Sequence, residues 1–418
     1  MSKILKLLLI LGMWASLAVD VQAQEVPLRK DQGLRFHTWY MINCEEESTW
    51  EADFKEIRET GFNCVALWNV IPVEGGSWDF TEIARNAPMT KRAIQAAHEA
   101  GLQVFLGIWN PTNMGVVTPQ HRLRSNQGKT PNQPNPYSET WQNDFWAPYL
   151  QGIKRDFGAC PGYAGIVFDD ATACTDDATI FYSYTPADER RFSEFLEKTY
   201  GSIASFNLQY RRGNQPYASF AEVKPPRTPL ESAKLWKDWM LARGEWSQDF
   251  ARLTRRTIGD ESEIIYIDYD YYIDRSRLVF GHDTAKMLKS FDRYGPYIAQ
   301  EFLRMSEEDL MTHVKRVISE AKEVCPPEKT HFCTWVNGLY QFEPMPKELV
   351  KKLVSTIVDQ GIHDITLYAY KVHDWRARGP ERSGKFNRPA LQEISFKYNP
   401  QMLAALREAI AESLARTR

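Results

Sequence analysis

The sequence lacks the short motifs on which several hydrolytic and nucleotide-binding mechanisms depend. It contains no Gly-x-Ser-x-Gly elbow, no His-Glu-x-x-His pair and no phosphate-binding loop. These motifs supply a serine nucleophile, zinc ligands and a phosphate cradle, so their absence excludes those chemistries. The Gly-rich first turn of a dinucleotide fold is also missing, because the first expected strand, 34–42, leads into Asn43-Cys44-Glu45.

The chain has few cysteines and a small net charge. The chain has 6 Cys in 418 residues, and its formal net charge is -3 with both signs scattered along the chain. No pair of Cys or His has zinc-ligand spacing, so neither a metal nor another cofactor is expected, and nothing favours nucleic acid as a partner. Cys64 and Cys333 lie inside apolar strand patterns and are expected in the core. Cys160 and Cys174 flank one strand and are not expected to pair directly.

Long apolar runs are absent except at the amino terminus. There, a basic start at Lys3 and Lys6 is followed by an apolar segment, 7–19, and by a small residue, Ala23. This pattern is typical of a cleaved secretory signal over residues 1–23. We therefore expect a periplasmic or secreted mature chain, 24–418, that does not span a membrane.

Short β-branched and aromatic runs alternate with longer segments that have helical spacing. Eight strands are predicted, at 34–42, 62–68, 102–109, 163–169, 263–268, 297–302, 331–335 and 364–370. Helices are predicted between them at 50–60, 87–100, 143–157, 187–200, 230–258, 284–290, 307–324 and 347–360, with a last one at 390–416. Eight such units in one domain predict an α/β fold of the (β/α)8 TIM barrel type, with long loops after the third, fourth and eighth strands.

The strand at 163–169 ends in two adjacent carboxylates, Asp169 and Asp170. Side chains alternate along a strand, so one of the two should face the cavity at the carboxyl end of a parallel barrel. The structural alternative is that one aspartate caps the next turn and the other pairs with an arginine.

Aromatic and amide side chains gather at the other strand ends, where substrates bind in such barrels. Flat rings beside polar groups suit a sugar, whose C–H faces pack on rings while its hydroxyls form hydrogen bonds. The predicted substrate-binding residues are Trp39, Trp68, Asn69, Trp109, Asn110, Asp268, Trp335, Asn337, Tyr368 and Tyr370. A single tryptophan at such a position is more often a packed core residue than a binding residue, so the prediction depends on the gathering of many of them at one face.

Two carboxylates that face each other can cleave a glycosidic bond, one as the acid and the other as nucleophile or base. Asp170 is the first candidate, with Asp169 beside it. Glu301, at the end of the sixth expected strand, and Asp270, after the fifth, are candidates for the partner. Glu301 is free of helix capping because Ser306 already caps the next helix, although a salt bridge to an arginine is its structural alternative.

The segment after the strand-end aspartates, 192–207 and 217–226, followed by a long helix from Leu235, resembles the β-galactosidases of glycoside hydrolase family 42. The shared features are a helix that ends in Tyr200-Gly201 and a segment that ends in Pro225-Pro226. The resemblance implies a glycoside hydrolase with a carbohydrate substrate.

The resemblance also assigns the acid/base. In that family the acid/base is the Glu of an Asn-Glu pair that ends the fourth strand. The equivalent pair here is Asp169-Asp170, so Asp170 matches the acid/base. The family nucleophile is a Glu on the seventh strand, where this sequence reads Thr334-Trp335-Val336-Asn337 and the nearest acid is Glu343. Beside the standard mechanism of the family, which this departure disfavours, two alternatives remain. One is a partner carboxylate at Glu301, as in barrels that use the fourth and sixth strands such as the α-galactosidase group. The other is a barrel that binds carbohydrate without cleaving it.

Overall fold

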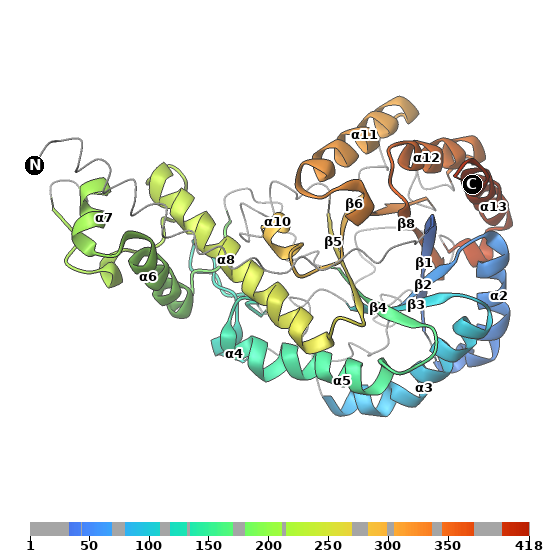
Figure 1. Cartoon of the computed structure of the whole chain (residues 1–418), viewed down its shortest axis with the longest axis horizontal. Coiled ribbons are helices and arrows are strands. Elements are labelled where there is room, and N and C mark those ends of the chain that lie inside the picture. Colours follow the sequence, from blue (N-terminus) through green and yellow to red (C-terminus); the bar gives the residue numbers. More distant parts are fainter. Residues whose placement is uncertain are drawn as a thin grey trace, which may run out of the picture.

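Eight parallel strands form a closed barrel in which each strand pairs with its neighbours in the sequence (Figure 1). The computed structural model describes residues 33–42, 44–68, 80–108, 118–131, 134–169, 180–210, 215–269, 283–298, 305–336, 345–371 and 395–417. The strands are β1 (Arg35–Met41), β2 (Cys64–Trp68), β3 (Gln103–Ile108), β4 (Tyr163–Asp169), β5 (Glu263–Tyr269), β6 (Arg293–Ile298), β7 (His331–Trp335) and β8 (Asp364–Lys371). The predicted (β/α)8 barrel is confirmed.

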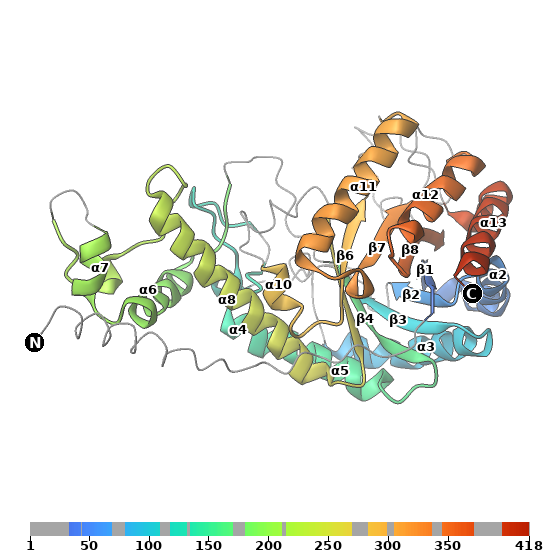
Figure 2. The same cartoon turned by 45° about the horizontal axis from the view of Figure 1, so that its top comes forward.

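Helices cover the outside of the barrel and lie close to the predicted positions (Figure 2). They are α2 (Trp50–Thr60), α3 (Phe80–Glu99), α4 (Glu139–Trp141), α5 (Ala147–Phe157), α8 (Ala233–Ile258), α10 (Thr284–Met287), α11 (Glu307–Val324), α12 (Lys347–Asp359) and α13 (Pro400–Arg416). The last helix begins ten residues later than predicted, because the Asn399 side chain caps it and Pro400 occupies its first turn. Among the described residues, no helix combines the length and apolar composition that crossing a bilayer would require.

Strand β6 begins four residues earlier than predicted and ends at Ile298. Proline cannot donate a hydrogen bond to a neighbouring strand, so Pro296 is typical of a strand boundary. In the barrel, Pro296 lies opposite Asp268 of β5, and pairing with β7 starts just after it, at Tyr297 and Cys333. The prediction that Glu301 ends this strand stays a prediction, because residue 301 lies outside the described residues.

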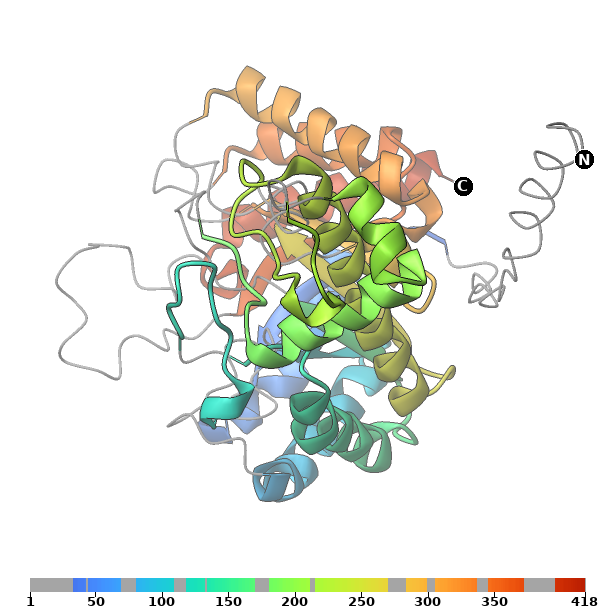
Figure 3. The ribbon, with the colours of Figure 1, turned by 90° about the vertical axis from the view of Figure 1, so that its left-hand side faces the viewer.

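The long connection between β4 and β5 builds an arm that extends from the barrel (Figures 1 and 2). It contains α6 (Pro186–Tyr200), α7 (Ile203–Gln209), a short 3-10 turn and the amino-terminal part of α8. The view from the arm side shows α6, α7 and α8 in front of the barrel (Figure 3).

The arm has a polar centre that ties its helices together. The Tyr200 and Tyr210 hydroxyls both donate to Asp238 Oδ2 at 2.7 Å, which joins α6 and the end of α7 to α8. At its other end α8 returns to the barrel, where Trp146 Nε1 donates to Thr254 Oγ1 at 2.8 Å. With 26 residues, α8 is about 39 Å long, and this length lets one helix serve both the arm and the barrel.

Candidate active site

Side chains of the strands alternate between the inside of the barrel and the layer under the helices. On β1, Trp39 and Met41 belong to a cluster whose members all come from strands, whereas Tyr40 packs in the larger cluster that includes helix residues. The inner cluster also contains Cys64 and Cys333, each at most 1% exposed, as the sequence predicts. The strand-only cluster is therefore the filled interior of the barrel.

Four aromatic rings dominate this interior, and we call Trp39, Trp68, Tyr297 and Tyr368 the aromatic cluster. Trp39 is at its centre: its ring centroid lies 4.1 Å from that of Trp68, 4.7 Å from that of Tyr368 and 6.0 Å from that of Tyr297. All four side chains are at most 4% exposed. The structure thus brings together three residues predicted to bind substrate, from β1, β2 and β8.

Tyr297 is the member that sequence reasoning missed. The predicted strand began at this residue, which placed it at the opposite end of the barrel from the substrate. The observed β6 begins at Arg293, so Tyr297 is its second-last residue and lies towards the carboxyl end. A Pro within the strand was the misleading signal.

Gly107 on β3 provides the space for Trp68. A Cβ atom at position 107 would lie 2.3 Å from Cδ2 and 2.4 Å from Cε2 of the indole. Real side chains do not approach so closely, so any larger residue would force the ring to move. The absence of a side chain on β3 therefore sets the position of Trp68.

Two predicted substrate-binding residues face away from the interior. Tyr370 packs in the layer under the helices, where its hydroxyl donates to Glu56 Oε2 at 2.5 Å and its ring stacks on Tyr40. On β5, Ile267 is an interior residue, and Asp268 follows it on the opposite side, where it accepts from the Tyr266 hydroxyl at 3.4 Å. The structure places both outside the aromatic cluster.

The remaining predicted residues are only partly described or are not described. Asp169 is the last residue of β4 and pairs with Ile267, and Trp335 ends β7 opposite Tyr368; only their backbones are described. The residues outside the described ranges are Asn69, Trp109, Asn110, Asp170, Asp270, Glu301 and Asn337.

A network of buried charges closes the opposite end of the barrel, where the strands begin. Arg35 donates to both carboxylate oxygens of Glu263, at 2.8 and 2.7 Å, and also to Asp364. Arg293 Nε lies 2.6 Å from Glu263 and 2.8 Å from Asp364. Two guanidinium groups thus balance the charge of two carboxylates, and the four residues come from four different strands.

Two histidines complete this network, which we call the floor cluster. His37 Nε2 and His331 Nδ1 lie 2.6 and 3.1 Å from the same oxygen of Asp364, and Thr366 Oγ1 lies 2.8 Å from His331 Nε2. Burial lowers the pKa of His37 to about 4. Burial alone would raise the pKa of Asp364, but Arg35 and Arg293 hold it well below its usual range.

The two histidines and Asp364 place ligand atoms within 4.8 Å of one another, which is close enough for a metal ion. Asp364, however, is already paired with two arginines whose charges repel a cation. The donor set does not fit a divalent metal. We interpret the floor cluster as a structural network, in keeping with the usual role of the amino-terminal face of such barrels.

Comparison with known proteins agrees with this barrel fold. The family model described as β-galactosidase, of glycoside hydrolase family 42, matches residues 39–317, about two thirds of the chain. The chain belongs to glycoside hydrolase family 42. No curated protein matches the sequence of this chain.

Solved structures of low sequence identity share its fold. The β-galactosidase from the psychrophilic Marinomonas ef1 aligns with a TM-score of 0.64 at 14% identity, over 91% of this chain and 59% of that one. The cold-adapted β-galactosidase from Rahnella sp. R3 gives 0.68 at 12% identity, over 94% and 58%. The catalytic domain of β-amylase from Paenibacillus polymyxa gives 0.55 at 12%, over 80% and 91%.

This family 42 chain spans less than two thirds of the length of the β-galactosidases that it matches. At these identities, the alignments show a common barrel.

Proposed function

We propose that this chain hydrolyses glycosidic bonds of an oligo- or polysaccharide, using two carboxylates at the carboxyl ends of the barrel strands. The observation that carries the proposal is the aromatic cluster, which lies inside a barrel of a glycoside hydrolase family and towards those ends. These rings are at most 4% exposed, so they would form the apolar base beneath a sugar that is held at those strand ends.

The first carboxylate comes from the end of β4. Val167 belongs to the barrel interior, and side chains alternate, so position 169 is expected on the same side. Position 170, which matches the family acid/base, follows directly, and the turn after the strand decides which carboxyl reaches the substrate. Asp170 remains the first candidate for the acid, with Asp169 beside it.

We place the second carboxylate on a strand other than β7. The structure ends β7 at Trp335, and Val336 and Asn337 follow, so the position of the family nucleophile carries no acid. Glu301 is our candidate, three residues after the end of β6, and Asp270, which directly follows β5, is the second. A carboxyl separation near about 5 Å would imply retention, and about 6.5–9.5 Å would imply inversion.

The test is release of sugar from a defined panel. We expect the purified chain, from Gln24 onwards, to release p-nitrophenol or reducing sugar from at least one member of a panel of nitrophenyl glycosides and soluble polysaccharides. β-Galactosides are tested first because of the family. Conversion of Asp170 to Asn should abolish release, whereas the exposed Asp359→Asn should not.

One observation favours a second function: the residues that follow β7, Val336 and Asn337, include no acid at the position of the family nucleophile. A barrel without a catalytic pair would bind carbohydrate and leave it intact. Saturable binding of an oligosaccharide with no product after prolonged incubation, by chromatography of the mixture, would support this binder and contradict the hydrolase.

Export is part of the proposal and rests on the pattern of residues 1–23. We expect the full chain, expressed in a Gram-negative host, to be recovered from the periplasm or medium with a mature amino terminus at Gln24. A chain that stays in the cytoplasm with Met1 or Ser2 at its terminus would contradict this location.

A further inference from the structure

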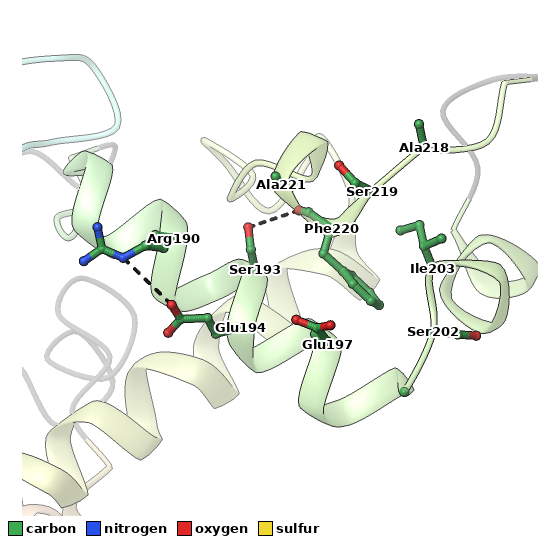
Figure 4. Close-up of a pocket in the computed structure, with 11 residues that line it drawn as sticks. Arg190, Ser193, Glu194, Glu197, Ser202, Ile203, Ala218, Ser219, Phe220 and Ala221 are labelled. Atoms are coloured by element: carbon green, nitrogen blue, oxygen red, sulfur yellow. Dashed lines mark hydrogen bonds and ion pairs between the residues drawn. The ribbon is translucent and has the colours of Figure 1, made fainter.

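A groove lies on the arm, which extends away from the barrel strands (Figure 1), and its lining residues are drawn in Figure 4. Helix α6 forms one wall, the 3-10 turn Phe220–Glu222 and residues 218–219 form the other, and residues 201–203 close one end. Its volume is about 410 Å³. This size is within the range that holds a small ligand such as one or two sugar rings.

The groove has a fixed aromatic side. Phe220 is half-buried and points from its turn towards α6 (Figure 4). One side of the ring is held by Phe206 of α7, whose centroid is 5.8 Å away at 69°. Ser193 of α6 donates to the Phe220 carbonyl oxygen at 3.0 Å and so anchors the turn to the helix. The ring is therefore positioned before any ligand arrives.

Opposite the ring is a row of acceptors. Glu194 and Glu197 are three residues apart on α6, so both lie on the face that lines the groove. Glu194 is 3.8 Å from Arg190, which also lines the groove and adds donors. Among the described residues, the Glu197 carboxylate forms no ion pair, and Figure 4 shows it next to the Phe220 ring. An aromatic face beside carboxylates and a guanidinium group is the combination that holds a neutral sugar, through C–H packing and charge-assisted hydrogen bonds from its hydroxyls.

We propose that this groove is a second carbohydrate-binding site, which holds a neutral saccharide unit of the same polymer that the barrel cleaves. The inference rests on the proposed function for the identity of the polymer, but not for the binding itself. A site on the arm would raise the local concentration of a long substrate at the barrel and would leave short substrates unaffected.

The test is affinity electrophoresis in native gels that contain pectic galactan, arabinogalactan or galactomannan. Wild-type protein is expected to be retarded in at least one gel. Glu197→Gln and Phe220→Ala are expected to lose most of this retardation. Glu245→Gln is the matched control. Glu245 is a partly exposed glutamate of α8 that pairs with Lys198 at 3.3 Å outside the groove, so this variant should migrate as wild type does.

A melting curve of each variant separates binding from folding. Phe220 contributes to the packing of the arm. The gel retardation of Phe220→Ala is therefore interpreted only if the melting temperature of this variant stays near that of wild type. Glu197 is exposed, and its replacement removes no described contact. Glu197→Gln therefore decides the proposal even if Phe220→Ala unfolds.

Activity assays distinguish this proposal from the catalytic one. Glu197→Gln should leave kcat and KM for a nitrophenyl glycoside unchanged and raise KM for the polysaccharide several-fold. Retardation that Glu197→Gln abolishes, in a protein that cleaves nothing, would support the groove and contradict the hydrolase. A wild-type chain that is not retarded in any gel, or a Glu197→Gln variant retarded as strongly as Glu245→Gln, would overturn the groove whatever the chain cleaves.

Discussion

The Trp68 ring occupies the space that a side chain at Gly107 would need. The Cβ that Gly107 lacks would lie 2.3 Å from the Trp68 ring, and that ring in turn packs on Trp39 at 4.1 Å. A residue on β3 with no side chain thus sets the position of the buried rings beneath the strand ends where a sugar would bind. This coupling can be tested without changing any aromatic residue.

Replacement of Gly107 by Ala should displace Trp68. We expect a loss of about 1–3 kcal/mol in the free energy of unfolding, as for other overpacked cores, together with a clear rise in KM for the substrate. Urea unfolding followed by tryptophan fluorescence measures the first, and initial rates measure the second. Gly33→Ala is the control, because a Cβ there would meet nothing within 4 Å. Equal behaviour of the two variants would show that the ring adapts and that Gly107 does not shape the site.

Two tyrosines on β8 provide a matched comparison of the two faces of one strand. Tyr370→Phe removes a partly buried hydrogen bond to Glu56, so we expect a lower melting temperature, equivalent to about 1 kcal/mol, with KM unchanged. Tyr368→Phe alters the interior aromatic cluster, so we expect a changed KM. Thermal unfolding and kinetics on the same preparations measure both. A KM effect of Tyr370→Phe as large as that of Tyr368→Phe would contradict the assignment of faces.

The alternation of strands and helices predicted the barrel, because it follows from period-2 and period-3.6 patterns that are local in the sequence. All eight strands were found, and seven lie within two residues of their predicted bounds. The exception, β6, has Pro296 inside it, and only pairing with β5 shows that the strand continues through this residue.

The site was harder to predict because the face on which a residue lies depends on register. Tyr368 and Tyr370 are both near the end of β8, yet they lie on opposite sides of the sheet. The floor cluster was missed because Arg35, Glu263 and Asp364 are far apart in the chain and meet only when the barrel closes. No local pattern marks such a network, apart from charged residues at the starts of otherwise apolar strands.

Removal of one carboxylate from the floor cluster should destabilise the protein strongly. Asp364→Asn leaves Arg35 and Arg293 with one buried carboxylate instead of two, and we expect a loss of about 3–5 kcal/mol. The control is Asp359→Asn at an exposed pair with Arg416, 3.1 Å apart, where the change should stay within about 0.5 kcal/mol. Chemical denaturation measures both. A small effect at Asp364 would show that the network contributes little to stability.

The same network should make stability depend on pH. The pKa of His37 is about 4 in the folded protein against 6.5 as its ordinary value, so between these values the unfolded chain binds more protons. The free energy of unfolding should therefore fall as pH decreases from about 6.5 to about 4, by at most about 1.4 kcal/mol per pH unit from this residue. Denaturation curves of wild type and His37→Asn across this window test the prediction. An equally steep slope in His37→Asn would assign the pH dependence to other groups.

The two aspartates after Val167 should differ in their effects on catalysis. Asp170 matches the family acid/base, so Asp170→Asn should reduce kcat by at least about 10²-fold while sugar affinity and melting temperature stay close to wild type. Asp169, paired in register with Ile267 and expected on the interior side, should act on substrate binding, so Asp169→Asn should raise KM more than it lowers kcat. Steady-state kinetics and calorimetric titration with the product sugar measure these effects. If Asp169→Asn abolishes turnover and Asp170→Asn retains it, the acid is Asp169, and the alternation of side chains along β4 outweighs the correspondence with the family.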